Sequence, residues 1–489
     1  MKLTADEMNE LVSKAMTYIS RMYISPDDCP LTGSGVHWIS DVPSQEEINV
    51  AQSLIQHIEE PIPENACENI DQLFQLIFEK LVPVSTNDNS PGYLAYIPGG
   101  GLFHASFAEF ISLCINRYVT IFMSAPGLAA IENKAVRWLA DIIGYPKTAG
   151  GIITSGGSLA TIFALHLARS CHFSLNPDQF VNGCLYASNQ THCCLTQALQ
   201  LCGFSEHQYE QVNTHPSDFR ICTKTLCQSI ENDLKKGKKP FMLIGNAGTT
   251  NTGAIDDLSV MADIAEKYHL WFHVDAAYGG FFMLTDHGKQ LMEGIRRADS
   301  VCIDPHKSLF FPYGTGALLV KDQATLRSVY TNNGTYLPVV QEESELPDDI
   351  MNISPEMTRE FRGLRIWLPL KMLGINVFRK QLEDKIVLAH WACKEIEKIK
   401  GIIIVAKPQL STFVFKLKTN NSGKNADDLN VRFINEINLQ GNILLSPFKG
   451  KGVPGNYAVR MSIVSYRTDK KRIEQGIEDI RLAAETIIQ

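Results

Sequence analysis

The chain has 489 residues, a length at which one hydrophobic core usually gives way to more than one, so we expect a large domain and at least one smaller one. Its 45% hydrophobic and 20% charged residues are typical of a globular protein, and no run of about 18 apolar residues predicts a membrane span. A formal net charge of −8 argues against a nucleic-acid partner, which would need a basic surface, and favours a small-molecule ligand.

The N-terminal segment and the cysteines both predict a cytoplasmic protein. Apolar residues recur at helical spacing from Met8 to Ile19 with acidic residues between them, unlike the layout of a signal peptide. The 12 cysteines form no paired C-x-x-C units, so we expect mostly reduced, buried thiols. Cys193 and Cys194 follow His192, but adjacent side chains point apart, and we expect no metal there.

The pattern of apolar residues predicts an α/β fold class with three parts. Residues 1–85 resemble a helical arm whose periodic segments, such as 70–81, are separated by prolines. Within 86–365, strand-like runs at 241–244, 270–274 and 316–320 alternate with helical stretches. Such alternation is typical of a mostly parallel sheet covered by helices on both faces.

The third part, residues 366–489, predicts a small α+β domain. It begins with a helix near 366–400 and ends in an amphipathic helix. Strand candidates between them lie at 402–406, 412–416 and 458–464.

A turn of small residues at 151–161 leads into a predicted helix that runs to about Leu167. Free backbone N–H groups and the positive end of the helix dipole would hold a phosphate there, with Gly156, Gly157 and Ser158 as the cradle. The turn is not a Walker loop, because no Gly-Lys-Ser/Thr follows, and the dinucleotide pattern G-x-G-x-x-G is absent.

His192 and Asp275 follow this turn along the chain, and both suit a flat ring. The imidazole of His192 could lie over such a ring, although a lone histidine is more often a structural residue. Asp275 comes at the end of a buried strand-like run, where ligands of parallel sheets collect, and an ionised carboxylate facing a pyridine nitrogen would keep that nitrogen protonated. The alternatives for Asp275 are a helix cap or a metal pair with His273, for which no third ligand has suitable spacing.

Lys307 ends the segment Ala-Asp-Ser-Val-Cys-Ile-Asp-Pro-His-Lys at 298–307. A lysine after a short apolar run and a proline can place its amine at the mouth of a sheet, where we expect desolvation to lower its pKa enough for Schiff-base chemistry. A loop lysine by itself is usually a surface residue. One flat, phosphorylated aldehyde cofactor would nevertheless explain the phosphate turn, the histidine, the aspartate and the lysine together.

With these motifs the sequence resembles the group II pyridoxal-5′-phosphate (PLP) decarboxylases of fold type I, which include aromatic-L-amino-acid, histidine and glutamate decarboxylases. The resemblance covers nearly the whole chain, from 36–43 through 90–98 to 361–367, and the H-V-D-A-A-Y and D-P-H-K segments are specific in combination. It implies a PLP-dependent transferase-like fold, amino-acid decarboxylase activity, and an obligate homodimer with the N-terminal arm wrapped around the partner.

The resemblance also implies roles for individual residues. Lys307 would carry PLP as a Schiff base, Asp275 would pair with the pyridine nitrogen, and His192 would stack on the ring. The other implied cofactor-binding residues are Gly157, Ser158, Asp304 and His306 at the phosphate, Thr250 near the 3′ oxygen, and Ala277. The implied substrate pocket comprises Tyr96, Ile97, Pro98 and Thr120. Aromatic-amino-acid decarboxylases tend to place aromatics where Ile97 and Thr120 stand, so the prediction only leans towards an aromatic substrate.

The chain departs from the family at the last proton transfer. In relatives a mobile loop of the neighbouring subunit typically supplies a tyrosine, but here no Tyr, His or Lys lies between Leu337 and Glu360, and Ile353 stands at the expected place. Either Tyr336, the nearest phenol, or His192 donates the proton to a quinonoid intermediate. Otherwise this intermediate meets oxygen and gives an aldehyde by oxidative deamination.

Two further alternatives remain open. A PLP lyase or aminotransferase of the same fold would keep Lys307 and Asp275, and Arg460 or Arg467 could bind the second carboxylate that a transaminase needs. A scaffold protein descended from an enzyme would have lost cofactor residues, and all of them are present.

Overall fold

The structure of the chain, a computed structural model, describes residues 2–28, 31, 45–56, 58–59, 61–67, 69–173, 177–331, 347–418, 424–449 and 457–488. Two compact units divide the chain: one comprises 1–100, 391–405 and 415–489, and the other comprises 101–390 and 406–414. The division at 85/86 and 365/366 stays a prediction. None of the helices in the ranges above is long and apolar enough to cross a membrane.

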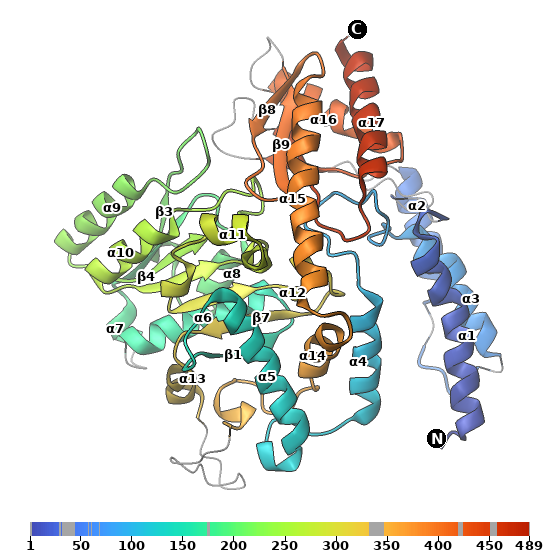
Figure 1. Ribbon diagram of the computed structural model, residues 1–489, viewed down its shortest axis with the longest axis horizontal. Helices are drawn as coiled ribbons and strands as arrows, with labels where there is room; N and C mark the ends of the chain where they lie inside the picture. The colour runs from blue at the N-terminus through green and yellow to red at the C-terminus, as the bar shows by residue number, and fades with distance from the viewer. Residues whose placement is uncertain are drawn as a thin grey trace. The chain divides into compact units, whose positions relative to one another are not determined.

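The first unit begins with the predicted N-terminal helix, α1 (Ala5–Ile24), which is drawn in blue in Figure 1. A capping box starts it, because the Thr4 side chain accepts the Glu7 N–H (3.3 Å) and the Glu7 carboxylate accepts the Thr4 N–H (2.6 Å). α2 (Gln45–Gln56) and α3 (Ile70–Gln75) follow, and α3 continues as a π-helical turn at Leu76–Leu81.

The C-terminal part forms a four-stranded sheet in the order β10-β11-β9-β8. Its strands are β8 (Ile402–Ala406), β9 (Thr412–Leu417), β10 (Ser446–Lys449) and β11 (Tyr457–Ser462). Helix α16 (Lys424–Leu439) packs on β11 and on α17 (Lys470–Ile488). The predicted strands and final helix are confirmed, whereas β10, a four-residue strand containing Pro447, was not predicted.

The second unit is built on a seven-stranded sheet in the order β1-β7-β6-β5-β4-β2-β3. Neighbouring strands are parallel from β6 to β3, and β7 is antiparallel to both β1 and β6, which confirms the mostly parallel prediction. The strands are β1 (Gly150–Thr154), β2 (Gly183–Ser188), β3 (Tyr209–Val212), β4 (Lys239–Asn246), β5 (Trp271–Asp275), β6 (Ser300–Ile303) and β7 (Gly316–Val320).

Helix α6 (Gly157–His172) lies across this sheet and contacts β1, β4, β5, β6 and β7. Its small and apolar residues pack in one cluster with the strands, as expected for strands that are apolar throughout. The other helices of the central region are α4 (Phe103–Ile115), α5 (Pro126–Ile143), α7 (Pro177–Phe180), α8 (Cys194–Leu201), α9 (Thr223–Lys235), α10 (Leu258–Tyr268), α11 (Asp286–Leu291), α12 (Pro305–Ser308), α13 (Gln323–Tyr330), α14 (Gly363–Leu373) and α15 (Ile375–Glu397).

Strands β1, β2, β4, β5 and β6 all end at one edge of the large sheet. Antiparallel β7 lies between β1 and β6, so these two strands run in the same direction. Thr154 at the end of β1 pairs with Gly316 at the start of β7, and Asn246 at the end of β4 pairs with Asp275 at the end of β5. The turns after these strands therefore converge, and such an edge is where open α/β sheets bind ligands.

Candidate active site

A cavity of about 410 Å³ lies among these turns, and every cofactor residue predicted from the sequence lines it. Those residues are Gly156, Gly157, Ser158, His192, Thr250, Asp275, Ala277, Asp304, His306 and Lys307. They come from five separate segments of the sequence, which the fold brings together at one site. Their roles stay predictions, but the structure gathers them at one site.

The glycines at the start of α6 leave room for a phosphate. Gly156 precedes the first turn of the helix, whose N–H groups have no partner within the helix. A Cβ atom on Gly157 would lie 3.1 Å from Asp304 Oδ2 and 3.2 Å from the Ala277 Cβ. Asp304 Oδ1 is buried and has no hydrogen-bond partner among the described residues. This cradle of backbone donors fits the phosphate end of PLP, with a carboxylate at its side.

Lys307 points towards Asp304, and its Nζ lies 3.0 Å from Asp304 Oδ2. Burial lowers the pKa of Lys307, but the carboxylates of Asp304 and Asp275 raise it by more, so the net shift is upward. Desolvation thus acts in the expected direction, but the expected net lowering of the Lys307 pKa is wrong, because the two carboxylates outweigh it. Lys307 is therefore a charged ammonium that forms an ion pair with Asp304, and it must lose a proton before it can react as an amine.

His192 is positioned just after β2 as an uncharged ring. Its Nδ1 accepts the Cys194 N–H (3.2 Å), which leaves the proton of the neutral ring on Nε2. Burial lowers the pKa of His192, and the Asp275 carboxylate opposes this only in part. A neutral imidazole is suited to stacking on a ring and poorly suited to giving up a proton.

Asp275 is the last residue of β5, as the sequence predicts. Its Oδ1 accepts hydrogen bonds from the Ala277 N–H (3.1 Å) and the Cys302 thiol (3.3 Å). His273, considered as a metal partner of Asp275, is fully buried with Nδ1 2.8 Å from Ser300 Oγ. Burial lowers the pKa of His273 to about 4, so this ring is neutral and structural.

The sequence motifs missed several residues of the cavity, including Asn246 and Tyr313. Asn246 follows the predicted strand 241–244 and ends β4, and a longer strand prediction would have placed it at the site. Its amide donates to Ser188 Oγ (3.2 Å), Thr191 Oγ1 (3.1 Å) and buried Asp256 (3.0 Å). It thereby ties down the turn that carries His192.

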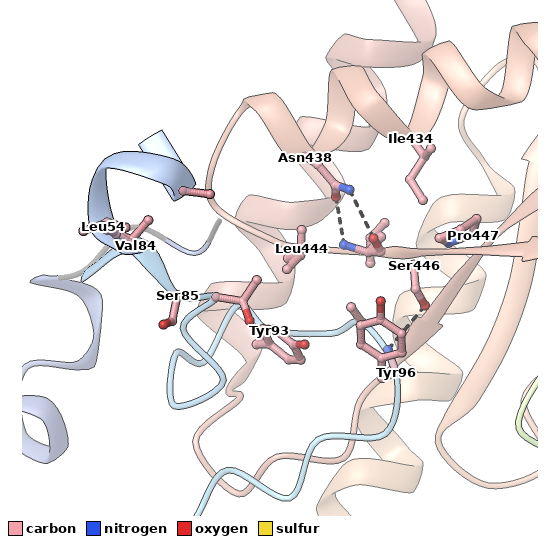
Figure 2. Close-up of a pocket in the computed structure, with 14 residues that line it drawn as sticks. Leu54, Val84, Ser85, Tyr93, Tyr96, Ile434, Asn438, Leu444, Ser446 and Pro447 are labelled. Atoms are coloured by element: carbon pink, nitrogen blue, oxygen red, sulfur yellow. Dashed lines mark hydrogen bonds between the residues drawn. The ribbon is translucent and has the colours of Figure 1, made fainter. Parts of the chain in front are cut away.

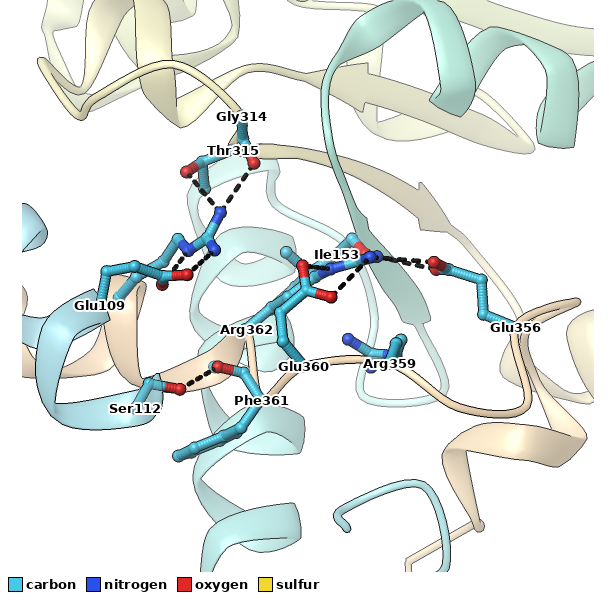
Figure 3. Close-up of polar contacts among 12 residues, drawn as sticks. Glu109, Ser112, Ile153, Gly314, Thr315, Glu356, Arg359, Glu360, Phe361 and Arg362 are labelled. Atoms are coloured by element: carbon cyan, nitrogen blue, oxygen red, sulfur yellow. Dashed lines mark hydrogen bonds and ion pairs between the residues drawn. The ribbon is translucent and has the colours of Figure 1, made fainter. Parts of the chain in front are cut away.

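Arginines of the segment before α14 hold the elements around the site. Figure 3 shows Arg362 between Glu356 and Glu360, with its guanidinium also donating to the Ile153 carbonyl of β1 (2.9 Å). Arg359 forms a buried ion pair with Glu132 of α5. Because Glu132 also accepts the N–H groups of Arg362 and Gly363, its carboxylate joins α5 to the start of α14.

The predicted substrate residues are divided between the two units, and the predicted proton donor Tyr336 lies outside the described residues. Ile97 and Pro98 are buried residues of the first unit, and Thr120 is a buried residue of the second. Tyr96, also of the first unit, is 56% exposed with φ +53° and lines a second cavity of about 410 Å³ (Figure 2). The substrate pocket stays a prediction.

Comparisons with known proteins show the family of the chain. The family model "Pyridoxal-dependent decarboxylase conserved domain" matches residues 52–418. Aromatic-L-amino-acid decarboxylase of Bacillus atrophaeus is 30% identical over 489 residues, which are 100% of this chain and 97% of that protein. Phenylacetaldehyde synthase of Arabidopsis thaliana is 25% identical over 430 residues, 86% of this chain and 87% of that protein. The crystal structure of Oryza sativa TDC with PLP and tryptamine has a TM-score of 0.91 at 21% identity and full coverage of both chains.

The family match, the full-length relative and the cavity with its lysine, aspartate and phosphate cradle lead to the same conclusion. The chain belongs to the pyridoxal-dependent decarboxylase family and is a PLP-dependent amino-acid decarboxylase.

Proposed function

We propose that the chain decarboxylates an aromatic L-amino acid to the corresponding amine and CO2. The observation that carries this proposal is the convergence of Lys307, Asp275, His192 and the α6 cradle in one cavity. The aromatic substrate class is supported by a full-length relative at 30% identity that is named for aromatic amino acids.

Each group would contribute a distinct part of the chemistry. Bound PLP would supply a ring that accepts the electron pair left behind when CO2 departs. The start of α6 would bind the phosphate. At the other end of the cofactor, the carboxylate of Asp275 would stabilise the positive charge of the protonated ring nitrogen. Neutral His192 would cover the ring face without adding a charge. Lys307 would hold the cofactor until the substrate amine replaces it.

A second candidate is decarboxylation followed by oxidation to an aldehyde. Ile353, at the place where a tyrosine is expected, is 3% exposed and packs in the core of the large sheet. Ile350 is equally buried, in the cluster that includes Phe361 of the same segment. Neither side chain can donate a proton, and one relative at 25% identity is a phenylacetaldehyde synthase.

The experiment loads the full-length protein with PLP and offers it a panel of aromatic, acidic and basic L-amino acids in air. CO2, amine, aldehyde and hydrogen peroxide are measured together, with Lys307→Ala as the control that cannot form the Schiff base. We expect CO2 and equimolar amine from an aromatic amino acid. CO2 with aldehyde and peroxide would establish the second candidate, and CO2 from acidic or basic amino acids alone would contradict the aromatic assignment.

A further inference from the structure

The active-site cavity is lined by a phenol that lies outside the recognised motifs. Tyr313 lies in the turn between α12 and β7 and lines the same cavity as Lys307 and Asp304. Its ring centroid is 6.0 Å from that of His306, another residue of the cavity. Tyr313 is 63% exposed, so water reaches it and can replace a proton that it loses.

The turn that carries Tyr313 is held by an ion pair between two helices. Arg365 of α14 donates to the Gly314 carbonyl (2.7 Å) and, through Nε, to Glu109 of α4 (2.6 Å). Gly314 has φ +88°, a backbone conformation that residues with a side chain rarely adopt. The backbone conformation of Gly314 and its hydrogen bond from Arg365 therefore fix the position of the residue that follows Tyr313.

Three other side chains of the cavity that carry a proton, those of His192, Cys194 and Tyr278, are poorly suited to donating it. The pKa of His192 is lowered by burial, so its ring is neutral. Burial raises the pKa of the Cys194 thiol to about 11, and this residue is 8% exposed. Tyr278 is 2% exposed, with its hydroxyl 2.9 Å from Ser411 Oγ and accepting the Ser411 N–H. Among the described phenols of the cavity, only Tyr313 is open to water.

We propose that Tyr313 is a catalytic residue that donates the proton which completes the decarboxylation. This inference rests on the proposed function. When the bond between Cα and the carboxylate breaks, CO2 leaves and the electron pair of that bond stays with Cα. The O–H bond of Tyr313 then breaks, its proton forms the new C–H bond with that pair, and the phenolate takes a proton from water. The net reaction consumes one proton, needs no oxidant, and gives the amine.

The test compares Tyr313→Phe with the wild-type protein, both loaded with PLP and given the amino acid that the wild type decarboxylates. Phe keeps the ring and removes only the acidic proton. General acid catalysis is typically worth about 10² to 10⁴ in rate, so we expect amine formation to fall by at least about 10²-fold. Per CO2 released, aldehyde and peroxide should rise, because the electron pair at Cα then survives long enough to meet oxygen.

A second readout separates proton donation from cofactor binding. The dissociation constant of PLP from the apoprotein and the visible absorption spectrum of the holoprotein should be the same in Tyr313→Phe and wild type. Loss of PLP affinity in the variant would overturn the inference, because the phenol would then serve the cofactor rather than the proton. The matched control is Tyr330→Phe, which removes a phenol that contacts His166 on α6 away from the cavity. This variant should behave as wild type.

An unchanged rate of amine formation in Tyr313→Phe would also overturn the inference. A loss of rate in Tyr336→Phe would then identify Tyr336 as the donor, and no loss there would leave Lys307 or another group. By contrast, absence of CO2 from wild-type protein with every amino acid would contradict the proposed function itself and is recognised before any variant is made.

Discussion

Asp304 lies beside Lys307, whose positive charge its carboxylate stabilises, and beside the predicted phosphate site, where a negative charge is unfavourable. Its Oδ2 is 3.0 Å from Lys307 Nζ, and a Cβ on Gly157 in the phosphate cradle would lie 3.1 Å from the same oxygen. The carboxylate stabilises the ammonium form of Lys307 and would repel a phosphate beside it. Capture of PLP requires the neutral amine, so this carboxylate should slow the loading of the enzyme.

We therefore predict that Asp304→Asn captures PLP faster than wild type at neutral pH. Loss of the charge removes the main cause of the raised pKa of Lys307, so a larger fraction of the amine is neutral at a given pH. The pH profile of the capture rate should move to lower pH. Stopped-flow absorbance after PLP is added to apoprotein measures this profile. The exposed acid Asp286, changed to Asn, serves as control, and an unchanged profile for Asp304→Asn would contradict the prediction.

The contact between α5 and α14 depends on a glycine. A Cβ on Gly363 would lie 2.4 Å from the Cα of Glu132 and 2.9 Å from its backbone N, distances that no rotamer change can relieve. Gly127, on α5 itself, has no atom within 4 Å of the position of an added Cβ. Substitution by Ala therefore places the same methyl group against packed backbone at Gly363 and in open space at Gly127.

We predict that Gly363→Ala destabilises the protein by about 1–3 kcal/mol, because the helices must separate to admit the methyl group. Gly127→Ala should be neutral or stabilising by up to about 1 kcal/mol, since Ala restricts the unfolded chain and meets no obstacle. Thermal unfolding of both variants beside wild type measures the difference. Equal transition temperatures for Gly363→Ala and Gly127→Ala would show that this close approach does not exist.

The elements that the sequence predicts well are those with one strong local pattern. The run at 316–320 is a strand with these bounds because all its residues are buried, whereas β3, an edge strand with mixed exposure, has no such pattern and was missed. Lys307 and Asp275 are recognised because their neighbours along the chain carry the signal. Tyr313 is not, because its position depends on the Arg365–Glu109 pair, whose members are 256 residues apart in sequence.

Helix α4 carries a row of apolar side chains that are exposed in the single chain. On α4, Phe107, Phe110 and Leu113 are 43%, 50% and 58% exposed, while Ala105, Ala108 and Ser112 on the same helix are buried. These exposed residues recur every three residues and so share one face of the helix. Contiguous apolar surface of this kind is typical of an interface, which supports the homodimer that the family resemblance implies.

We predict that the wild-type protein is a dimer and that Leu113→Glu shifts it towards the monomer. A charge in the α4 row would have to be buried without a partner in the dimer, whereas in the monomer it stays in water. Light scattering after size-exclusion chromatography gives the mass directly. The control is Leu234→Glu on α9, where the leucine is 48% exposed but no other residue of that helix presents a large exposed apolar side chain. If α4 forms the interface, Leu234→Glu keeps the mass of two chains and Leu113→Glu does not. A dimer in both variants would place the interface elsewhere. A monomeric wild-type protein would contradict the predicted homodimer itself.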